Sequence, residues 1–353
     1  MKIAITGEKG FLGYHLTQYY KWVKGFEVVE LGKNYIENIN LLHNCSLLIH
    51  CAGVNKGKDV YEKNISLTRN LVEVLTNHNI NIDIKFTSST QENNGSEYGN
   101  AKLQSKILLQ NYCYRSKTKF ESYKIPNLFG PFGKPNYNSF INTFCYNIVN
   151  NKKCQHNNKV VTLCYVYDAI KTIDNQIEFN ITKKTVYEIY KLLRSFHTDY
   201  SKGIIPDLTN IFEKNLFNTY RSFSKIEFKQ KTHTDNRGHL VELVKGKGSQ
   251  SQVFFSTTKP GITRGNHFHF NKIERFCILQ GNARISMRKV GCNKKNHYII
   301  SGNDNKVIDM PILYTHNITN IGSSELVCVF WVNEIFNEKN TDDTKLKSKN
   351  KYA

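Results

Sequence analysis

The sequence predicts a doubly wound parallel α/β sheet followed by an all-β sandwich or barrel. The first half of the chain alternates apolar strand patterns with amphipathic helix patterns. From about Phe223 onward, short β-rich runs follow one another at close spacing, separated by Gly and Asn turns. A length of 353 residues is sufficient for two hydrophobic cores. These three observations together indicate two domains.

The first half alternates between strands and helices. Short apolar runs predict strands at residues 2–6, 26–31, 44–54, 82–90 and 120–130. Helical spacing of apolar residues predicts helices at residues 10–24, 65–79 and 98–116. Because the connections between them are short, these elements are typical of a parallel sheet with helices on its faces.

Strand patterns dominate the second half. They lie at residues 239–244, 251–258, 275–288, 296–302, 305–313 and 325–334. A first domain is therefore expected over residues 1–225 and a second over residues 226–337, joined near residues 222–231. Residues 338–353 are polar and are expected to form a disordered tail.

Composition and charge exclude several classes of protein. A hydrophobic content of 39% fits a globular protein, and no apolar run approaches the roughly 18 residues of a membrane helix. The nine cysteines form no C-x-x-C pair and are expected to be reduced thiols of a cytoplasmic protein without a signal peptide. The formal charge of +20 is spread along the chain without a nucleic-acid-binding motif. We therefore expect small anionic ligands as partners, and neither nucleic acid nor membrane.

A glycine-rich loop follows the first predicted strand. Gly7, Gly10 and Gly13 allow a tight turn and let backbone N–H groups approach a pyrophosphate at a helix N-terminus. The strand before and the helix after this loop favour a dinucleotide site over a bare turn. After the second strand stand Glu30, which would favour a free ribose 2′-OH, and Lys33, which would favour a 2′-phosphate. Lys33 leads us to expect NADPH, with NADH left open.

Tyr98 and Lys102 are four residues apart in the third predicted helix, so their side chains share a face. A nearby ammonium is expected to lower the pKa of Tyr98 toward the working range of a general acid. Ser89, at the carboxyl end of a strand, could hydrogen-bond the same substrate carbonyl. Y-x-x-x-K alone is common on solvated helices, but here it accompanies the glycine loop and the phrases "HCAGV" and "IPNLFG".

With these motifs the N-terminal region resembles the extended short-chain dehydrogenases/reductases (SDRs) that act on nucleotide sugars, which have a Rossmann-type fold. The resemblance implies that Ser89, Tyr98 and Lys102 form a catalytic triad and that Lys102 also binds the nicotinamide ribose. It implies a cofactor site made of Gly7, Gly10, Phe11, Leu12, Gly13, Lys33, Ala52, Gly53, Tyr98, Lys102 and Asn127. The gap between Ser89 and Tyr98 is shorter than in most such reductases, so the loop over the site is expected to be trimmed.

A histidine-rich motif lies in the second half. Residues 261–281 fit G-x5-H-x-H-x4-E-x6-G and residues 311–320 fit P-x4-H-x3-N, which resemble the two signatures of cupin (jelly-roll) domains. Leu313 stands where the second signature usually has glycine. His267 and His269 alternate along a strand and so face the same side. Together with Glu274 and His316 they predict a site for Zn²⁺ or another divalent ion, whereas a single one would more simply be a structural histidine.

The two regions together resemble one family over nearly the whole chain, the bifunctional capsular-polysaccharide enzymes of the CapF/WbjC family. The phrases that support the resemblance are "PNLFG", "KPNYNSFINTFCYNI", "FEKNLFNTY", "KPGITRGNH", "YTHNI" and "WVNE". The sequence departs from the family at Lys124, at Leu313 and in a shortened region at residues 178–191. The segment 235–243 also resembles the opening of cupin-type 4-keto-sugar epimerases. There, Arg237 could pair with a nucleotide phosphate or with an acid across a turn.

The family resemblance implies a two-step reaction on a UDP-linked 4-keto-6-deoxy-N-acetylhexosamine, a UDP-2-acetamido-2,6-dideoxy-4-hexulose made by a separate 4,6-dehydratase. The cupin would epimerise C3, where the C4 ketone makes the proton acidic and a metal stabilises the enolate. The SDR site would then transfer hydride from NADPH to C4 while Tyr98 protonates the alkoxide. The product would be a UDP-N-acetyl-6-deoxy-L-talosamine type sugar for L-FucNAc or L-RhaNAc glycans. The resemblance also implies a homodimer.

Two alternatives stay open. A fused 3,5-epimerase/4-reductase of the rhamnose type would apply the same logic to a 4-keto-6-deoxyhexose without the acetamido group, and such epimerases usually use a His–Asp dyad without metal. A non-catalytic protein that binds a dinucleotide and a sugar is the second alternative. The presence of Ser89, Tyr98 and Lys102 argues against it, because a binding protein does not need a proton donor.

Overall fold

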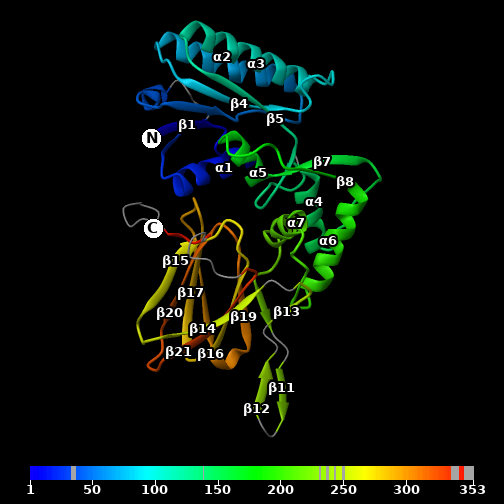
Figure 1. The fold of residues 1–353 in the computed structure, drawn as a ribbon, viewed down its shortest axis with the longest axis vertical. Helices are drawn as coiled ribbons and strands as arrows, with labels where there is room; N and C mark the ends of the chain where they lie inside the picture. Colours follow the sequence, from blue (N-terminus) through cyan, green and yellow to red (C-terminus); the bar gives the residue numbers. More distant parts are fainter. Residues whose placement is uncertain are drawn as a thin grey trace. The chain divides into compact units, whose positions relative to one another are not determined.

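The computed structural model describes residues 1–32, 37–137, 139–229, 232–235, 238–241, 244–248, 251–334 and 342–345. The chain divides into two compact units (Figure 1). Unit 1 contains residues 1–143 and 159–185, and unit 2 contains residues 144–158 and 186–353. The predicted fold class is confirmed, whereas the boundary expected between residues 225 and 226 remains a prediction.

Unit 1 is built on a parallel five-stranded sheet in the order β2-β1-β3-β4-β5. Its strands are β1 (Lys2–Thr6), β2 (Glu27–Glu30), β3 (Leu47–His50), β4 (Asp83–Ser89) and β5 (Phe120–Ile125). All five coincide with predicted strands. β1 and β3 lie in the interior of the sheet, and the apolar residues 3–5 of β1 and 48–49 of β3 are fully buried. The chain order reverses between β1 and β3, which is where open α/β sheets bind ligands.

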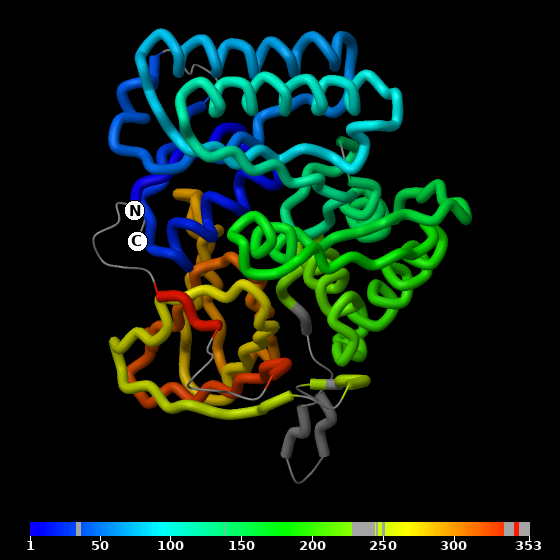
Figure 2. The backbone as a smooth tube through the Cα atoms, turned by 45° about the horizontal axis from the view of Figure 1, so that its top comes forward, coloured from blue at the N-terminus to red at the C-terminus, as the bar shows by residue number. Residues whose placement is uncertain are grey.

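Helices cover both faces of this sheet. They are α1 (Phe11–Gln18), which continues into a π-helical turn (Tyr19–Val23), α2 (Val60–Asn77), α3 (Glu97–Ser116) and α5 (Val166–Ile173). Figures 1 and 2 show α2 and α3 side by side on one face, with α1 and α5 on the other. A smaller sheet follows in the order β6-β7-β8, made of β6 (Asn127–Phe129), β7 (Val160–Tyr165) and β8 (Ile181–Thr185). Helix α4 (Phe140–Val149) begins in unit 1 and ends in unit 2.

Two five-stranded sheets form the core of unit 2. The first has the order β10-β19-β16-β21-β14, and the second has the order β18-β17-β20-β15-β22. The strands are β10 (Glu227–Lys229), β14 (Gln252–Thr258), β15 (Thr263–Phe268), β16 (Glu274–Gln280), β17 (Asn282–Lys289), β18 (Lys295–Ser301), β19 (Lys306–Met310), β20 (Tyr314–Asn320), β21 (Leu326–Val332) and β22 (Thr344–Lys345). Apolar side chains from both sheets, among them Phe276, Ile285 and Ile318, pack into one core. The predicted strand 275–288 is in fact a hairpin, because Gly281 at φ +86° turns the chain between β16 and β17.

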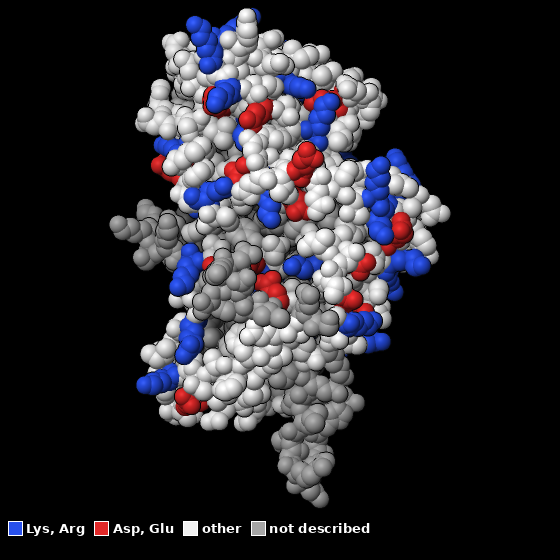
Figure 3. Space-filling model, in the orientation of Figure 1, with Lys and Arg blue, Asp and Glu red and all other residues white. Residues whose placement is uncertain are grey.

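The remaining elements of unit 2 are helices α6 (Val186–Tyr200) and α7 (Ile211–Arg221), the short pair β9 (Ile204–Ile205) with β13 (Lys245–Gly246), and the hairpin β11 (Thr232–Asp235) with β12 (Gly238–Val241). The predicted tail lies mostly outside the described residues, but residues 344–345 pair with β15 as β22. No helix of the described residues has the length and apolar character needed to cross a membrane. On the face drawn in Figure 3, Lys and Arg are interspersed with Asp and Glu instead of gathering in one patch.

A buried ion cluster joins α7 to the core of unit 2. Arg275 donates from Nε to Asp309 Oδ1 at 2.7 Å, and both side chains are almost fully buried. Arg221 donates to the carbonyl of Met310 at 3.0 Å and lies 4.0 Å from Asp309 Oδ2. Burial lowers the pKa of each guanidinium to about 9 and raises that of Asp309. Such charges are tolerated inside a core only because they are paired.

Replacement of Asp309 with alanine should therefore destabilise unit 2 strongly. The substitution removes the carboxylate that lies beside the buried guanidiniums of Arg221 and Arg275, and breaking a buried ion pair typically costs about 3–5 kcal/mol. The effect is measured as the denaturant concentration at the midpoint of unfolding in guanidinium chloride, followed by circular dichroism. Glu227→Ala serves as the control, because Glu227 pairs with Lys306 at the solvent-exposed surface, and it should leave the midpoint nearly unchanged. Equal midpoints for both variants would contradict this interpretation.

Candidate functional site

The glycine loop after β1 packs directly against the loop after β3. A Cβ atom on Gly7, which has φ +71°, would lie only 2.7 Å from the backbone nitrogen of Ala52. A Cβ on Gly13 would lie 2.1 Å from the carbonyl oxygen of Gly7, so this glycine lets α1 approach the loop. Gly10 donates to the same carbonyl at 2.8 Å and closes the turn. The glycines thus hold two backbone loops together where the strand order reverses.

The N-cap residue of α1 is a glycine, which has no side chain to cap the helix. Gly10 occupies the N-cap position without a side-chain hydrogen bond, and the first helical turn contains no acidic residue. Its backbone N–H groups therefore remain available to an anion such as a pyrophosphate. Phe11 and Leu12 lie in this first turn, while Lys33 lies outside the described residues.

Asn64 of α2 fixes the loop after β3 and was not found from the sequence. Its Oδ1 accepts from the backbone N–H of Val54 at 3.0 Å, and its Nδ2 donates to the carbonyls of Val54 and Val60 at 2.7 Å. A Cβ on Gly53 would lie 2.9 Å from Asn64 Oδ1 and 3.4 Å from Lys102 Nζ. Gly53 is therefore held beside Lys102, and a cofactor-binding role for Ala52 and Gly53 stays a prediction. In the sequence, the only sign of this role was that Asn64, a polar residue, falls on the same side of α2 as its buried apolar residues.

The three predicted catalytic residues lie on adjoining elements. Ser89 ends β4 and accepts from the backbone N–H of Gln91 at 3.1 Å. Helix α3 begins soon after, with its N-cap Ser96 accepting from the N–H of Gly99, so Tyr98 and Lys102 lie in the first two turns. The trimmed connection between Ser89 and Tyr98 is therefore compatible with bringing the three residues to one end of the sheet.

Burial sets the protonation of this site. Lys102 is buried, donates from Nζ to the carbonyl of Thr87 at 2.9 Å and lies 6.0 Å from the ring centroid of Tyr98. Burial lowers the pKa of Lys102 to about 8, an effect that Cys51 and Glu92 partly offset. Burial raises the pKa of Tyr98 to about 12. The expectation that the ammonium lowers this pKa is wrong, because desolvation outweighs the charge at this separation, and the phenol keeps its proton.

Glu92, in the trimmed loop, is a further charged residue that the sequence did not indicate. Its side chain is 2% exposed and accepts a hydrogen bond from Ser88. Its Oε2 lies 3.4 Å from Lys124 Nζ and 3.7 Å from Lys106 Nζ. Asn127, predicted to lie near the nicotinamide, donates to the carbonyl of Thr162 at 3.2 Å, and its role stays a prediction.

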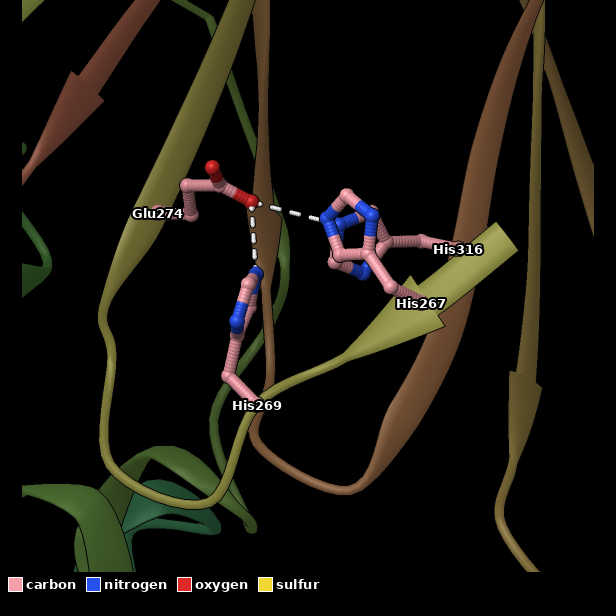
Figure 4. Close-up of side chains that lie close together, drawn as sticks. All are labelled: His267, His269, Glu274 and His316. Carbon is pink, nitrogen blue, oxygen red and sulfur yellow. Dashed lines mark hydrogen bonds and ion pairs between the residues drawn. The ribbon is translucent and has the colours of Figure 1, made fainter. Parts of the chain in front are cut away.

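The four predicted metal ligands come together inside unit 2 (Figure 4). His267 of β15 is the cross-strand partner of His316 of β20, His269 follows the end of β15, and Glu274 begins β16. One ligand atom from each lies within 4.8 Å of the other three. Glu274 Oε2 is 3.2 Å from Nε2 of both His269 and His316. Three imidazoles and one carboxylate are thereby directed at a common point.

The Nδ1 atoms of two of these histidines face backbone carbonyls. Nδ1 of His316 faces the carbonyl of Tyr314 at 3.1 Å, and Nδ1 of His269 faces the carbonyl of Asp342 at 3.3 Å. Carbonyl oxygens only accept, so Nδ1 is protonated in both rings and Nε2 is the nitrogen that would bind a metal. Nε2 of His269 makes a hydrogen bond with Glu274 Oε2 at 3.2 Å, and a metal ion would take the place of that proton. Nε2 of His316 is buried and is not aligned for a hydrogen bond with the same oxygen.

The charges of this cluster also fit a cation. Burial and the neighbouring histidines lower the pKa of His267 to about 4. Burial would raise the pKa of Glu274, but the hydrogen bond with His269 and the closeness of His316 hold this pKa well below its usual value. A neutral imidazole and an ionised carboxylate are the forms that ligate metals. The donor set of three nitrogens and one oxygen fits Zn²⁺ or another divalent first-row ion.

Leu313 takes the place of the glycine expected in the second cupin signature. Its φ of +56° lies in the left-handed region, and its side chain is fully buried. Its N–H donates to the carbonyl of His269 at 2.9 Å, and its own carbonyl accepts from Val290 at 2.9 Å. Leu313 therefore ties the turn before β20 to one of the ligand residues, and its buried side chain offsets the strained backbone.

Comparison with known proteins assigns the chain to a family. Residues 3–189 match the model of the NAD dependent epimerase/dehydratase family, and residues 233–344 match that of the polysaccharide biosynthesis C-terminal domain. The chain therefore belongs to the NAD dependent epimerase/dehydratase family, which implies a nicotinamide dinucleotide cofactor. The match covers the glycine loop as well as Ser89, Tyr98 and Lys102.

Relatives that match over the full length identify a narrower family. A UDP-2-acetamido-2,6-beta-L-arabino-hexul-4-ose reductase of Pseudomonas aeruginosa is 30% identical over 363 residues, which cover 97% of each chain. The crystal structure of the capsular polysaccharide assembling protein CapF from Staphylococcus aureus is 33% identical, covers 98% of this chain and all of the other, and gives a TM-score of 0.61. CapF with the inhibitor 3-isopropenyl-tropolone is 32% identical at the same coverage, with a TM-score of 0.58. The chain is a member of the CapF family, which confirms the resemblance.

Gly13→Ala should abolish tight dinucleotide binding. The new methyl group would lie 2.1 Å from Gly7 O, so α1 must move away from the loop that it supports. We expect the Kd for NADPH, measured by isothermal titration calorimetry, to rise at least about tenfold, equivalent to about 1.4 kcal/mol. Gly322→Ala is the matched control, because a Cβ there meets its nearest atom at 3.5 Å. Unchanged NADPH affinity in Gly13→Ala would contradict the assignment of this loop.

Leu313→Gly should destabilise the protein although it restores the residue usual in the signature. Glycine relieves about 1–2 kcal/mol of left-handed strain, but loss of a buried leucine costs about 3–5 kcal/mol. We expect a lower unfolding temperature in differential scanning calorimetry. A higher unfolding temperature would show that strain at this turn outweighs packing.

Proposed function

We propose that this protein is a bifunctional nucleotide-sugar enzyme. It epimerises C3 of a UDP-2-acetamido-2,6-dideoxy-4-hexulose in unit 2 and then reduces C4 with NADPH in unit 1. The product is a UDP-N-acetyl-6-deoxy-L-talosamine type sugar, used for L-FucNAc or L-RhaNAc glycans. The observation that supports the proposal best is that one chain contains both a Ser–Tyr–Lys set and a three-histidine, one-glutamate cluster.

The substrate class is supported by the name of the Pseudomonas relative. That protein is called a UDP-2-acetamido-2,6-beta-L-arabino-hexul-4-ose reductase, a name that specifies a UDP-linked acetamido sugar with a ketone at C4, and it aligns with nearly the whole of this chain. A C4 ketone explains why two sites are useful. It first makes the proton on C3 acidic enough to remove, and it is then consumed by reduction to an alcohol.

In the reduction, Tyr98 donates its phenolic proton to the oxygen that develops on C4. The raised pKa of Tyr98 keeps this proton in place until the alkoxide forms. Ser89 hydrogen-bonds the same oxygen, and Lys102 holds the nicotinamide ribose. The cofactor, when bound, supplies the hydride to C4. We propose NADPH in preference to NADH because Lys33 follows the second strand in the sequence, and we propose a homodimer on the family resemblance.

In the epimerisation, His267, His269, Glu274 and His316 hold a divalent ion, which we propose is Zn²⁺. A bound ion would supply Lewis-acid stabilisation of negative charge on the C4 oxygen. His269, Glu274 and His316 are buried and His267 is half-buried, so these side chains are largely shielded from water. The pKa of Glu274 is held low, so its carboxylate stays ionised and binds the ion at neutral pH.

Incubation of the protein with UDP-4-keto-6-deoxy-N-acetylhexosamine in D₂O, with and without NADPH, tests both steps. Tyr98→Phe should lower NADPH oxidation by about 10²–10⁴-fold, the usual contribution of a general acid, and leave deuterium exchange at C3 intact. His269→Ala should abolish the exchange but still oxidise NADPH when given the C3-epimerised ketone. Mass spectrometry follows the exchange, and absorbance at 340 nm follows the reduction.

The outcomes separate this proposal from its alternatives. Absence of both activities in the wild-type protein overturns it and favours a binding protein. Turnover only of a 4-keto-6-deoxyhexose nucleotide without the acetamido group, in protein that retains no metal, favours the rhamnose-type enzyme. Loss of both activities in each variant contradicts two independent sites.

A further inference from the structure

Residues 342–345 lie against the strand that carries the first metal ligand. Thr344 and Lys345 form β22, which pairs antiparallel with β15 so that Lys345 is opposite His267 and Thr344 is opposite Phe268. These residues are far from β15 in sequence, so only the tertiary fold brings them together. We call residues 342–345 the C-terminal clamp.

Asp342 fixes the loop between two ligands. Its carboxylate accepts from the backbone N–H groups of residues 270, 271 and 272, at 3.1, 2.7 and 2.7 Å. These residues are three of the four that connect His269 to Glu274. A carboxylate bound by consecutive backbone N–H groups is a strong anion site, so the clamp sets the path of this loop.

Asp343 meets His269 directly. Its Oδ1 lies 3.3 Å from His269 Nδ1 and 2.6 Å from Lys272 Nζ. His269 is 2% exposed and Asp343 is 31% exposed, so their contact is partly shielded from water. A carboxylate oxygen therefore faces the ring nitrogen that points away from the other ligands.

We propose that Asp343 is a positioning residue of the metal centre, with the C-terminal clamp as its support. Asp343 and the carbonyl of Asp342 hold the Nδ1–H of His269, so that the ring directs its Nε2 at the ion. A carboxylate on the far nitrogen of a ligating imidazole fixes the ring and makes the ligating nitrogen more basic. The inference rests on the metal site of the proposed function, but it concerns affinity for the ion and not the reaction.

Metal affinity tests the proposal without any sugar substrate. The full-length protein is titrated with Zn²⁺ against a chromophoric chelator, and with Co²⁺ while its visible absorption is recorded. Asp343→Ala should weaken Zn²⁺ binding by about 10–100-fold and change the Co²⁺ spectrum, because the His269 ring loses its partner. Asp343→Asn should weaken binding less, since its amide oxygen still accepts a hydrogen bond. Asp343→Glu should recover part of the loss.

Glu325→Gln is the matched control. It removes one carboxylate from the same unit. Glu325 precedes the first residue of β21, whereas the residue that pairs with Glu274 is the last one of that strand, so the control lies at the far end of the strand from the metal site. It should bind Zn²⁺ as the wild-type protein does. Circular dichroism of the metal-free variants verifies that the fold is retained.

The two possible failures are distinct. Wild-type affinity and an unchanged Co²⁺ spectrum in Asp343→Ala would overturn the role of Asp343 and leave the metal site standing. Absence of Zn²⁺ binding by the wild-type protein would overturn the metal site itself, and this inference with it.

Discussion

Removal of the Glu274 carboxylate from water is the constraint on which the site of unit 2 depends. An ionised carboxylate in a core costs several kcal/mol unless partners compensate for the lost solvent. Here two imidazoles lie 3.2 Å from one of its oxygens. Those imidazoles are in turn held by backbone carbonyls and by Asp343, while Leu313 donates to the backbone carbonyl of His269. The histidine cluster, the strained turn and the clamp are thus parts of one electrostatic arrangement inside an apolar barrel.

Unit 1 depends on a different kind of constraint, the close approach of backbones. Gly7 and Gly13 allow contacts that no side chain would permit, and Asn64 holds the facing loop with its amide. Lys102 is then buried beside that loop, which makes its ammonium sensitive to the few charges around it. A backbone arrangement thereby controls the charge of a residue that we propose to be catalytic.

Local patterns predicted the fold and the principal site residues, because alternating hydrophobicity and short motifs depend only on neighbours in sequence. The Y-x-x-x-K spacing and the cupin signatures are of this kind. Asn64, Glu92 and Asp343 were missed because their roles arise from tertiary contacts, with Asp343 lying 74 residues from its partner His269. The pKa of Tyr98 was predicted in the wrong direction, because a sequence does not show the burial that dominates it.

The chain passes between its two units three times, at residues 143–144, 158–159 and 185–186. A ribosome therefore completes every strand of unit 1 before it has made most of unit 2. Until then residues 144–158 lack the later part of unit 2, although Phe144, Cys145 and Ile148 are buried in the finished protein. Apolar surface that is transiently exposed in this way makes a folding intermediate prone to aggregation. The three crossings therefore make the order in which the two units fold a matter of solubility as well as of stability.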